Sequence, residues 1–305
     1  MREWLLAQTP SGIEILIALQ QWQTPALNAI MKAITDLGSA ELALLVVPIV
    51  LWCVDKEFGV RLIYAYLGVS YVNSALKALF HIPRPFSQVF KDFNAKLHPL
   101  RGEDSFSWPS GHAQNAVVVW GYTAYRVHRR WVQVLAVLIV LLIGFSRMYV
   151  GVHTPIDVLG GWAAGVLCLV GGIWIEPRLA ERWRRLSFVH QLLIAVVVPV
   201  LLTLVAYSPA ITMTTGALLG LSVGFVCEAR YVRFAVQGVW WKRLLRGLTG
   251  LALLLPIYLG LKAFMPEAGA LWPRLARYAV IGLAMSFGAP WLFVRVGLAA
   301  REERE

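Results

Sequence analysis

Long apolar segments recur along the chain at intervals close to the length of a helix. The clearest are ALLVVPIVLWCV (43–54), VQVLAVLIVLLIGF (132–145), QLLIAVVVPVLLTLVAY (191–207) and GLTGLALLLPIYLGL (247–261). A helix needs about 20 mostly apolar residues to cross a bilayer, and these segments reach that length with their flanks. The pattern therefore predicts an all-α, polytopic membrane helical bundle. We predict nine spans, at residues 40–54, 57–80, 111–127, 131–150, 154–175, 188–206, 210–227, 247–264 and 274–297.

The region before the first predicted span has a different pattern. Residues 12–36 place apolar and polar residues at helical spacing, but Gln20, Gln21, Gln23 and Asn28 make the region too polar for a span. Helices of this kind lie in the plane of the membrane interface. We therefore expect an N-terminal interfacial segment built from amphipathic helices.

Composition agrees with a membrane protein. Of the 305 residues, 58% are hydrophobic and only 15% are charged, whereas soluble domains carry about 25% charged residues. The mean hydropathy is +0.64. Cys53, Cys168 and Cys227 form no CxxC pair, so the sequence predicts neither a disulfide framework nor a zinc site.

The net charge of +11 could indicate a nucleic-acid partner, but the distribution of the charges argues against one. On the predicted topology, seventeen of the 28 Lys and Arg residues fall on one side, in segments 56–61, 126–130, 178–185, 230–246 and 295–304. The positive-inside rule makes this side cytoplasmic. The basic run RLAERWRRL (178–186) is then expected to contact anionic lipid headgroups. The other side holds the loop 81–110 and the turn near 150–154.

Three polar blocks occur on that second, extracytoplasmic side. They are KALFHIPRP (77–85), PSGH (109–112) and SRMYVGVHTPID (146–157). Ionisable residues inside or at the ends of spans are costly and usually mark function. Because all three blocks fall at the ends of spans on one face, we expect them to meet in one pocket.

Several residues in these blocks are of the types that bind anions. Lys77, Arg84 and Arg147 supply three cations, and the planar fork of arginine matches phosphate oxygens. Ser110 and Gly111 open a predicted span, and the N-terminus of a helix binds anions. The sequence therefore predicts a phosphate-binding site.

The remaining residues suit proton transfer and nucleophilic attack. His153 and Asp157 are spaced i, i+4, which places them on one helical face. A carboxylate bonded to one ring nitrogen leaves the other nitrogen free to attack. His112 could then protonate the leaving oxygen. Thr154 is a candidate N-cap for a helix that begins beside His153.

Taken together, the blocks resemble the three-part signature of the type 2 phosphatidic acid phosphatase superfamily, K-x6-R-P, P-S-G-H and S-R-x5-H-x3-D. All eleven fixed positions are present: Lys77, Arg84, Pro85, Pro109, Ser110, Gly111, His112, Ser146, Arg147, His153 and Asp157. The resemblance implies that His153 becomes a phosphohistidine, that Asp157 orients it and that His112 is the acid. It also implies that Lys77, Arg84, Ser110, Gly111 and Arg147 bind phosphate, with no metal or other cofactor.

The resemblance covers roughly residues 25–175 and implies a division of the chain. We expect an N-terminal segment (1–39), a phosphatase core (40–176) and additional C-terminal transmembrane helices (177–305). Four predicted spans after residue 187 go beyond the small six-span members of the family, and they leave the substrate class open.

The leading hypothesis is a membrane enzyme that releases phosphate from a lipid phosphate or lipid diphosphate, with polyprenyl diphosphate favoured. A sugar-phosphate phosphatase and a lipid phosphotransferase would use the same site. From a different class, the extra spans could form a lipid carrier or scramblase. We also expect the aromatics of loop 86–108 to form a rim that lies in the headgroup layer and admits a lipid.

Overall fold

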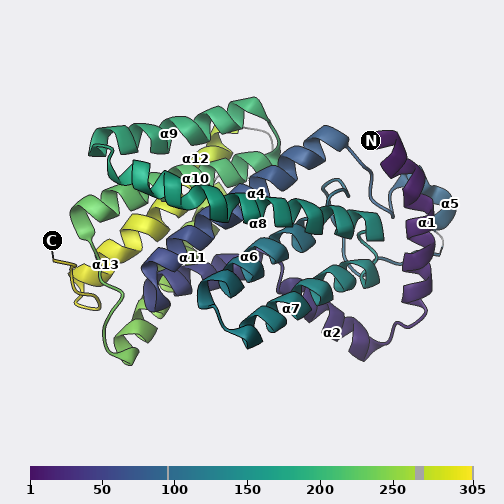
Figure 1. The fold of residues 1–305 in the computed structure, drawn as a ribbon, viewed down its shortest axis with the longest axis horizontal. Helices are drawn as coiled ribbons and strands as arrows, with labels where there is room; N and C mark the ends of the chain where they lie inside the picture. The colour runs from purple at the N-terminus through teal and green to yellow at the C-terminus, as the bar shows by residue number, and fades with distance from the viewer. Residues whose placement is uncertain (95, 265–270, 304–305) are drawn as a thin grey trace. The chain divides into compact units, whose positions relative to one another are not determined.

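The computed structural model describes residues 1–94, 96–264 and 271–303, and its regular structure is helical (Figure 1). Within these residues the only β-type pairing is an isolated bridge between Phe234 and Arg301. The helices are α1 (Arg2–Gln20), α2 (Pro25–Asp36), α3 (Ala40–Ile49), α4 (Lys56–Phe80), α5 (Lys91–Asn94), α6 (Gly111–Val127), α7 (Arg130–Tyr149), α8 (Pro155–Arg184), α9 (Phe188–Val205), α10 (Pro209–Cys227), α11 (Trp240–Phe264), α12 (Leu271–Leu283) and α13 (Ala289–Arg295). π-Helical turns continue α3 (Val50–Val54), continue α10 (Glu228–Val232) and join α12 to α13 (Ala284–Gly288).

Six segments of the described chain are long and apolar enough to cross a membrane. They are Arg130–Tyr149, Pro155–Arg184, Phe188–Val205, Pro209–Val232, Trp240–Phe264 and Leu271–Arg295. The all-helical, membrane-spanning class predicted from the sequence is confirmed. The count of nine spans stays a prediction, because the other three regions form helices of a different character. Leu42–Val54 is short, α6 has 17 residues, and α4 carries tyrosines, Asn73 and Lys77 along its length.

The helices gather into two compact units, formed by residues 1–43 with 68–174 and by residues 44–67 with 175–305. In the first unit, α7 packs against α6, α2 and α1. Thr24 caps α2, because its hydroxyl accepts a hydrogen bond from the Leu27 amide and Pro25 occupies the first turn. The division into three domains stays a prediction.

The two N-terminal helices use their polar residues inside the first unit. The Gln20 side chain exchanges two hydrogen bonds of 2.9 Å with the backbone of His98. Tyr149 of α7 donates to Asn28 of α2 over 2.7 Å. Some of the polar side chains that argued against a span thus make hydrogen bonds within the protein. The interfacial position of these helices stays a prediction.

The loop 86–108 packs differently from the expected rim. Leu97 is buried against Ile13 and Leu16 of α1, and Phe86, Phe90 and Phe93 pack against the same cluster. Phe106 stays exposed and stacks edge-on with His81. Most of these apolar side chains therefore join the core, because burying them against α1 removes more apolar surface from water than exposure at a rim.

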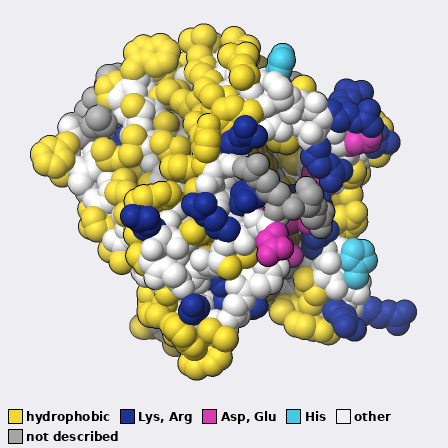
Figure 2. Space-filling view, turned by 90° about the vertical axis from the view of Figure 1, so that its left-hand side faces the viewer, with side chains coloured by type: hydrophobic (Ala, Val, Ile, Leu, Met, Phe, Trp, Pro, Cys, Tyr) yellow, Lys and Arg dark blue, Asp and Glu magenta, His cyan; other side chains and the backbone are white. Residues whose placement is uncertain are grey.

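In the second unit, α10 packs against α9 and α12. Ser208 caps α10 and accepts from the Ile211 amide over 3.2 Å. The buried Glu228 accepts from Lys56 and from the Phe234 amide. Many large apolar side chains of α9 and α11 remain exposed, among them Leu193, Val197, Leu201, Leu248, Leu255 and Leu259. Figure 2 shows broad hydrophobic areas beside a group of Lys and Arg side chains, the pattern of a surface that meets lipid and headgroups.

Candidate active site

All eight residues predicted for catalysis and phosphate binding lie in the first unit. Lys77 is in the last turn of α4, Arg84 follows α4 in the connection to the loop, and Arg147 is in the last turn of α7. Ser110 is the N-cap of α6, so Gly111 and His112 are its first two residues. His153 precedes α8 and Asp157 is the third residue of that helix.

Arg84 lies at the centre of the site. Its Nη1 donates to the Val152 carbonyl over 2.9 Å and lies 2.8 Å from Nε2 of His153. Its Nε donates to the Ser105 carbonyl over 2.7 Å, and its Nη2 donates to the Ser105 hydroxyl over 3.0 Å. Lys77 donates to the same hydroxyl over 3.0 Å. Ser105 therefore connects two of the three predicted cations.

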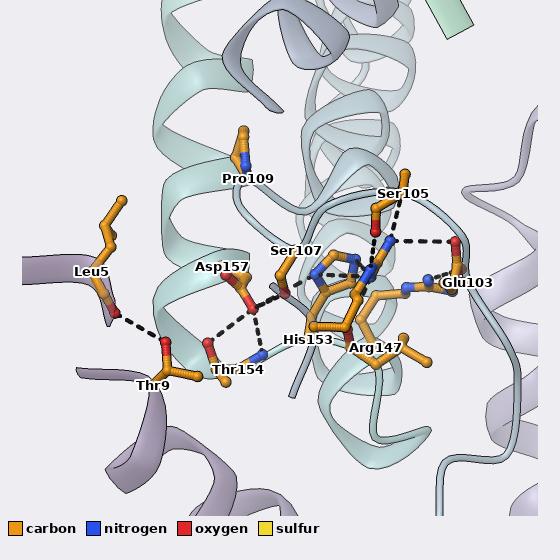
Figure 3. A network of polar contacts seen from close by, with 12 residues as sticks. Leu5, Thr9, Glu103, Ser105, Ser107, Pro109, Arg147, His153, Thr154 and Asp157 are labelled. Atoms are coloured by element: carbon orange, nitrogen blue, oxygen red, sulfur yellow. Dashed lines mark hydrogen bonds and ion pairs between the residues drawn. The ribbon is translucent and has the colours of Figure 1, made fainter. Parts of the chain in front are cut away.

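Arg147 is fully buried beside the same pocket. Its Nη1 donates to the Thr35 hydroxyl over 3.0 Å, and its Nη2 donates to the carboxylate of Glu103. The other carboxylate oxygen of Glu103 lies 3.4 Å from Nη2 of Arg84. Glu103 therefore contacts both guanidinium groups, and Figure 3 shows it beside Arg147.

The contact from Arg84 determines the tautomer of His153. Arginine has only donors, so Nε2 must accept and must carry the ring's lone pair. The proton of the neutral imidazole is then on Nδ1, on the side of Asp157. The His153 ring therefore presents a nucleophilic nitrogen toward the guanidinium of Arg84.

Asp157 is held by other partners than the sequence suggested. Its Oδ2 accepts from the Ser107 hydroxyl over 2.7 Å, from the Thr154 amide over 2.7 Å and from the Thr154 hydroxyl over 2.9 Å (Figure 3). Nδ1 of His153 is 3.7 Å away, beyond a hydrogen bond. The two side chains therefore make no direct hydrogen bond in this part of the structure, and hydrogen bonds at such sites often shorten only when substrate binds.

The start of α8 explains the position of both residues. Pro155 is the first residue of the helix, and Asp157 accepts the Thr154 amide as the third residue of a capping box does. The Thr154 hydroxyl donates to Asp157, so it does not cap the helix as expected from the sequence. The preceding turn needs Gly151, which has a φ of +83° that a side chain would strain.

The PSGH turn is anchored on both sides. The Ser110 amide donates to the Asp157 carbonyl over 2.9 Å. Asn73 of α4 donates to the Pro109 carbonyl over 3.1 Å and to the Gln114 side chain over 2.7 Å. Among the described residues, no hydrogen-bond partner is found for the buried Ser110 hydroxyl, which is consistent with a role in binding a ligand. No hydrogen bond of the His112 ring is found in the described chain.

Burial and charge set the protonation states of the groups outside the helices. Burial, reinforced by Arg84, Arg147 and Lys77, lowers the pKa of His153 well below its ordinary value, so its ring is neutral near pH 7. Burial lowers the pKa of Arg84 to about 10, which leaves it charged. Burial alone would raise the pKa of Glu103, but Arg147 and Arg84 lower it below its usual value.

Four contributors to this network were missed by the sequence analysis, namely Thr35, Glu103, Ser105 and Ser107. Three of them fall in the run GEDSFS (102–107), which only Trp108 separates from PSGH, and this density of polar residues was the available signal. In the described part of the chain, no group of three or more His, Cys, Asp or Glu side chains could hold a metal ion.

Comparison with known proteins agrees with the signature. Residues 58–181 match the model of the PAP2 superfamily, and residues 212–301 match "PAP2 superfamily phosphatase, transmembrane extension". Phosphatidylglycerophosphatase B of Bacillus subtilis is 34% identical over 156 residues, which cover 47% of this chain and 72% of that protein. Undecaprenyl-diphosphatase of Sulfolobus acidocaldarius is 26% identical over 155 residues, which cover 50% and 73%.

Among solved structures, that of a transmembrane PAP2-type phosphatidylglycerolphosphate phosphatase from Bacillus subtilis is 28% identical. The match has a TM-score of 0.47 and covers 56% of this chain and 87% of the other.

The matches to the two family models and to the curated relatives define the class as a membrane-integrated phosphatase. The chain belongs to the PAP2 superfamily, and the membership inferred from the three motifs is confirmed. The match over residues 212–301 shows that the C-terminal helices also belong to the family, although none of the three motifs lies in them.

Proposed function

We propose that this phosphatase removes the terminal phosphate from a lipid phosphate or lipid diphosphate on the extracytoplasmic face of the membrane. Polyprenyl diphosphate is the favoured substrate. The observation that carries the proposal is the contact between Arg84 and Nε2 of His153, 2.8 Å long. A phosphoryl group bound by Arg84 would lie beside the lone pair of the nucleophile.

The proposed reaction has two steps. His153 attacks phosphorus through Nε2, while Lys77, Arg84, Arg147, the Ser110 hydroxyl and the Gly111 amide stabilise the phosphoryl oxygens. His112 gives its proton to the leaving oxygen, and Asp157 stabilises the positive charge on the His153 ring. Water then gives a proton to His112 and attacks the phosphohistidine, which releases phosphate and restores both histidines. Three cations neutralise the phosphoryl charge, so the proposal includes no metal, and chelators should leave the rate unchanged.

The lipid character of the substrate is supported by the membrane setting and by the relatives. The site lies in a unit whose α7 and α8 are candidate spans, so a phosphate could reach it while its chains remain in the bilayer. The curated relatives described above are named for a phosphatidylglycerophosphate and an undecaprenyl diphosphate substrate. The extracytoplasmic position rests on the distribution of Lys and Arg.

A competition assay tests the proposal. Purified protein receives polyprenyl diphosphate, phosphatidate and glucose 6-phosphate at equal concentration, and phosphate release from each is measured. We expect the diphosphate to be consumed fastest and His153→Ala to release none. Preference for the sugar phosphate would contradict the lipid substrate. Transfer of label to an added alcohol instead of water would indicate a phosphotransferase, and lipid transport by His153→Ala would support a carrier.

A further inference from the structure

Glu103 has a position that the proposed reaction does not use. Its carboxylate contacts Nη2 of Arg147 and lies 3.4 Å from Nη2 of Arg84, the two arginines proposed to bind phosphate. Carboxylate and phosphate oxygens are both acceptors that match the arginine fork. The negative group now between these arginines therefore belongs to the protein itself.

The position of Glu103 is also linked to the nucleophile. Arg84 contacts Glu103 through Nη2 and His153 through Nη1, so one guanidinium connects the carboxylate to the nitrogen that would attack. A substrate phosphate that bound Arg84 and Arg147 would meet the Glu103 carboxylate on the same donors. Two anions on the same donors repel each other strongly where burial reduces screening.

The segment around Glu103 allows its side chain to leave while the rest of the segment stays in place. Ser105 is anchored by Arg84 and Lys77, and Ser107 by the Ile82 carbonyl and Asp157. For Glu103 itself, the hydrogen bonds and ion pairs found in the described chain are all made by the carboxylate. Its side chain is 24% exposed, so it can turn toward solvent.

We propose that Glu103 is a specificity-determining residue that occupies the two phosphate-binding arginines between turnovers and that a substrate phosphate must displace. The inference rests on the proposed phosphatase function. A phosphate attached to a lipid is concentrated in the bilayer beside the site and can displace the carboxylate. Free phosphate lacks that local concentration, so Glu103 weakens its binding and favours its release after hydrolysis.

Inhibition by inorganic phosphate tests the proposal on full-length protein with a lipid phosphate substrate. Glu103→Gln keeps the size of the side chain and removes its charge, so we expect the Ki for phosphate to fall about tenfold or more, because bonds between charged groups are the stronger ones. Orthovanadate should show the same gain. A merely structural role would give the opposite result, namely weaker anion binding. An unchanged or higher Ki in Glu103→Gln would overturn the proposal.

Asp104→Asn is the matched control. It removes the same charge from the neighbouring residue, which is exposed and has no hydrogen bond or ion pair within the described chain. We expect its Ki to stay within about twofold of the wild type, since exposed charges interact weakly. An equal gain in Asp104→Asn would mean that overall charge, and not the contact with the arginines, controls anion binding. That result would also overturn the proposal.

Equilibrium binding separates this inference from the proposed function. Phosphate binding to wild-type and Glu103→Gln protein, measured by calorimetry without substrate, needs no turnover, and Arg147→Ala gives the baseline. If wild-type protein released phosphate from lipids but both proteins bound phosphate equally, only the role of Glu103 would fail. If no lipid phosphate were hydrolysed, the proposed function would fail, and the binding comparison would still test Glu103.

Discussion

Arg84 donates a hydrogen bond of 2.8 Å to Nε2 of His153, so the proposed phosphate-binding cation and the proposed nucleophile are in direct contact before substrate arrives. The lone pair that would attack phosphorus is engaged by the guanidinium. Substrate binding must therefore move Arg84 slightly, or draw its Nη1 toward a phosphoryl oxygen. Either change releases the nucleophile at the moment when its target is in reach.

The first prediction concerns Arg84. Arg84→Lys keeps the positive charge but loses the fork that contacts Ser105, Val152 and His153 together. We expect kcat/KM for a lipid phosphate to fall by about 10²–10³. The control is Arg101→Lys, since Arg101 pairs with Asp36 over 2.7 Å at a partly exposed position. Near-normal activity in Arg84→Lys would exclude a bidentate role for Arg84.

The second prediction concerns pH. The lowered pKa of His153 leaves its ring neutral at pH values where an ordinary histidine, of pKa about 6.5, is protonated. The acid limb of kcat/KM should therefore lie below about pH 6.5. The same shift makes the protein less stable as pH falls below about 6.5, because the unfolded chain binds the proton first. Rates and thermal unfolding measured from about pH 4.5 to pH 8 check both effects, and an acid limb above about pH 7 would contradict a neutral nucleophile.

The third prediction concerns Asn73, a positioning residue outside the motif. Asn73→Leu leaves the Pro109 carbonyl and the Gln114 side chain without their shared donor. Buried groups left without partners cost about 1–3 kcal/mol each, so the melting temperature should fall. Because the PSGH turn loses its anchor, kcat should fall more than KM changes. Ser70→Ala is the control and should change neither the melting temperature nor kcat, since Ser70 lies one turn earlier on α4 and its hydroxyl has no hydrogen bond to any described residue.

The sequence was sufficient for the class of fold, because apolar runs of helix length have few other solutions. It did not reveal how the helices gather. Trp52, in an apolar run near residue 50, donates to the carbonyl of Met285, and a contact between residues so far apart leaves no periodic signal. Residues 44–67 thus lie in the second unit.

The site likewise contains residues that the sequence predicts and residues that only the structure shows. Lys77, Arg84, Arg147, His153 and Asp157 carry a fixed spacing and could be found from it. Glu103 and Ser107 act through contacts made only after folding, and single polar residues in a loop are not distinguishable there from solvated ones. Asp157 illustrates the limit, because its spacing predicted a bond to His153 whereas Ser107 and Thr154 hold it in the structure.

The fourth prediction concerns topology. If the active site faces away from the cytoplasm, Lys96→Cys in loop 86–108 should react with an impermeant thiol reagent in intact cells. Cys53, Cys168 and Cys227 are replaced first, so that the reagent can label only the introduced cysteine. Arg129→Cys, in the exposed turn between α6 and α7, is the matched variant and should react only after lysis. The reverse pattern would place the site on the cytoplasmic face.

The last prediction concerns Gly161, where α8 approaches the PSGH turn. A Cβ at this position would lie 2.5 Å from the Ser110 carbonyl oxygen and 3.1 Å from Cβ of Ala113. Both neighbours belong to the start of α6, and one is backbone, so Gly161→Ala must push the helix N-terminus away from His153 and Asp157. Overpacking of this kind costs about 1–3 kcal/mol.

Displacement of the anion site should lower kcat/KM by about 10²-fold, since catalysis is sensitive to shifts of about 1 Å. Gly172→Ala is the matched control, on the same helix and with no atom of a described neighbour within 4 Å of the added Cβ. It should leave activity unchanged and stabilise the helix slightly, because alanine favours helices by up to about 1 kcal/mol over glycine. Rates and melting temperatures of Gly161→Ala and Gly172→Ala test this prediction. Equal activity would show that the start of α6 need not be held at this distance for phosphate to bind.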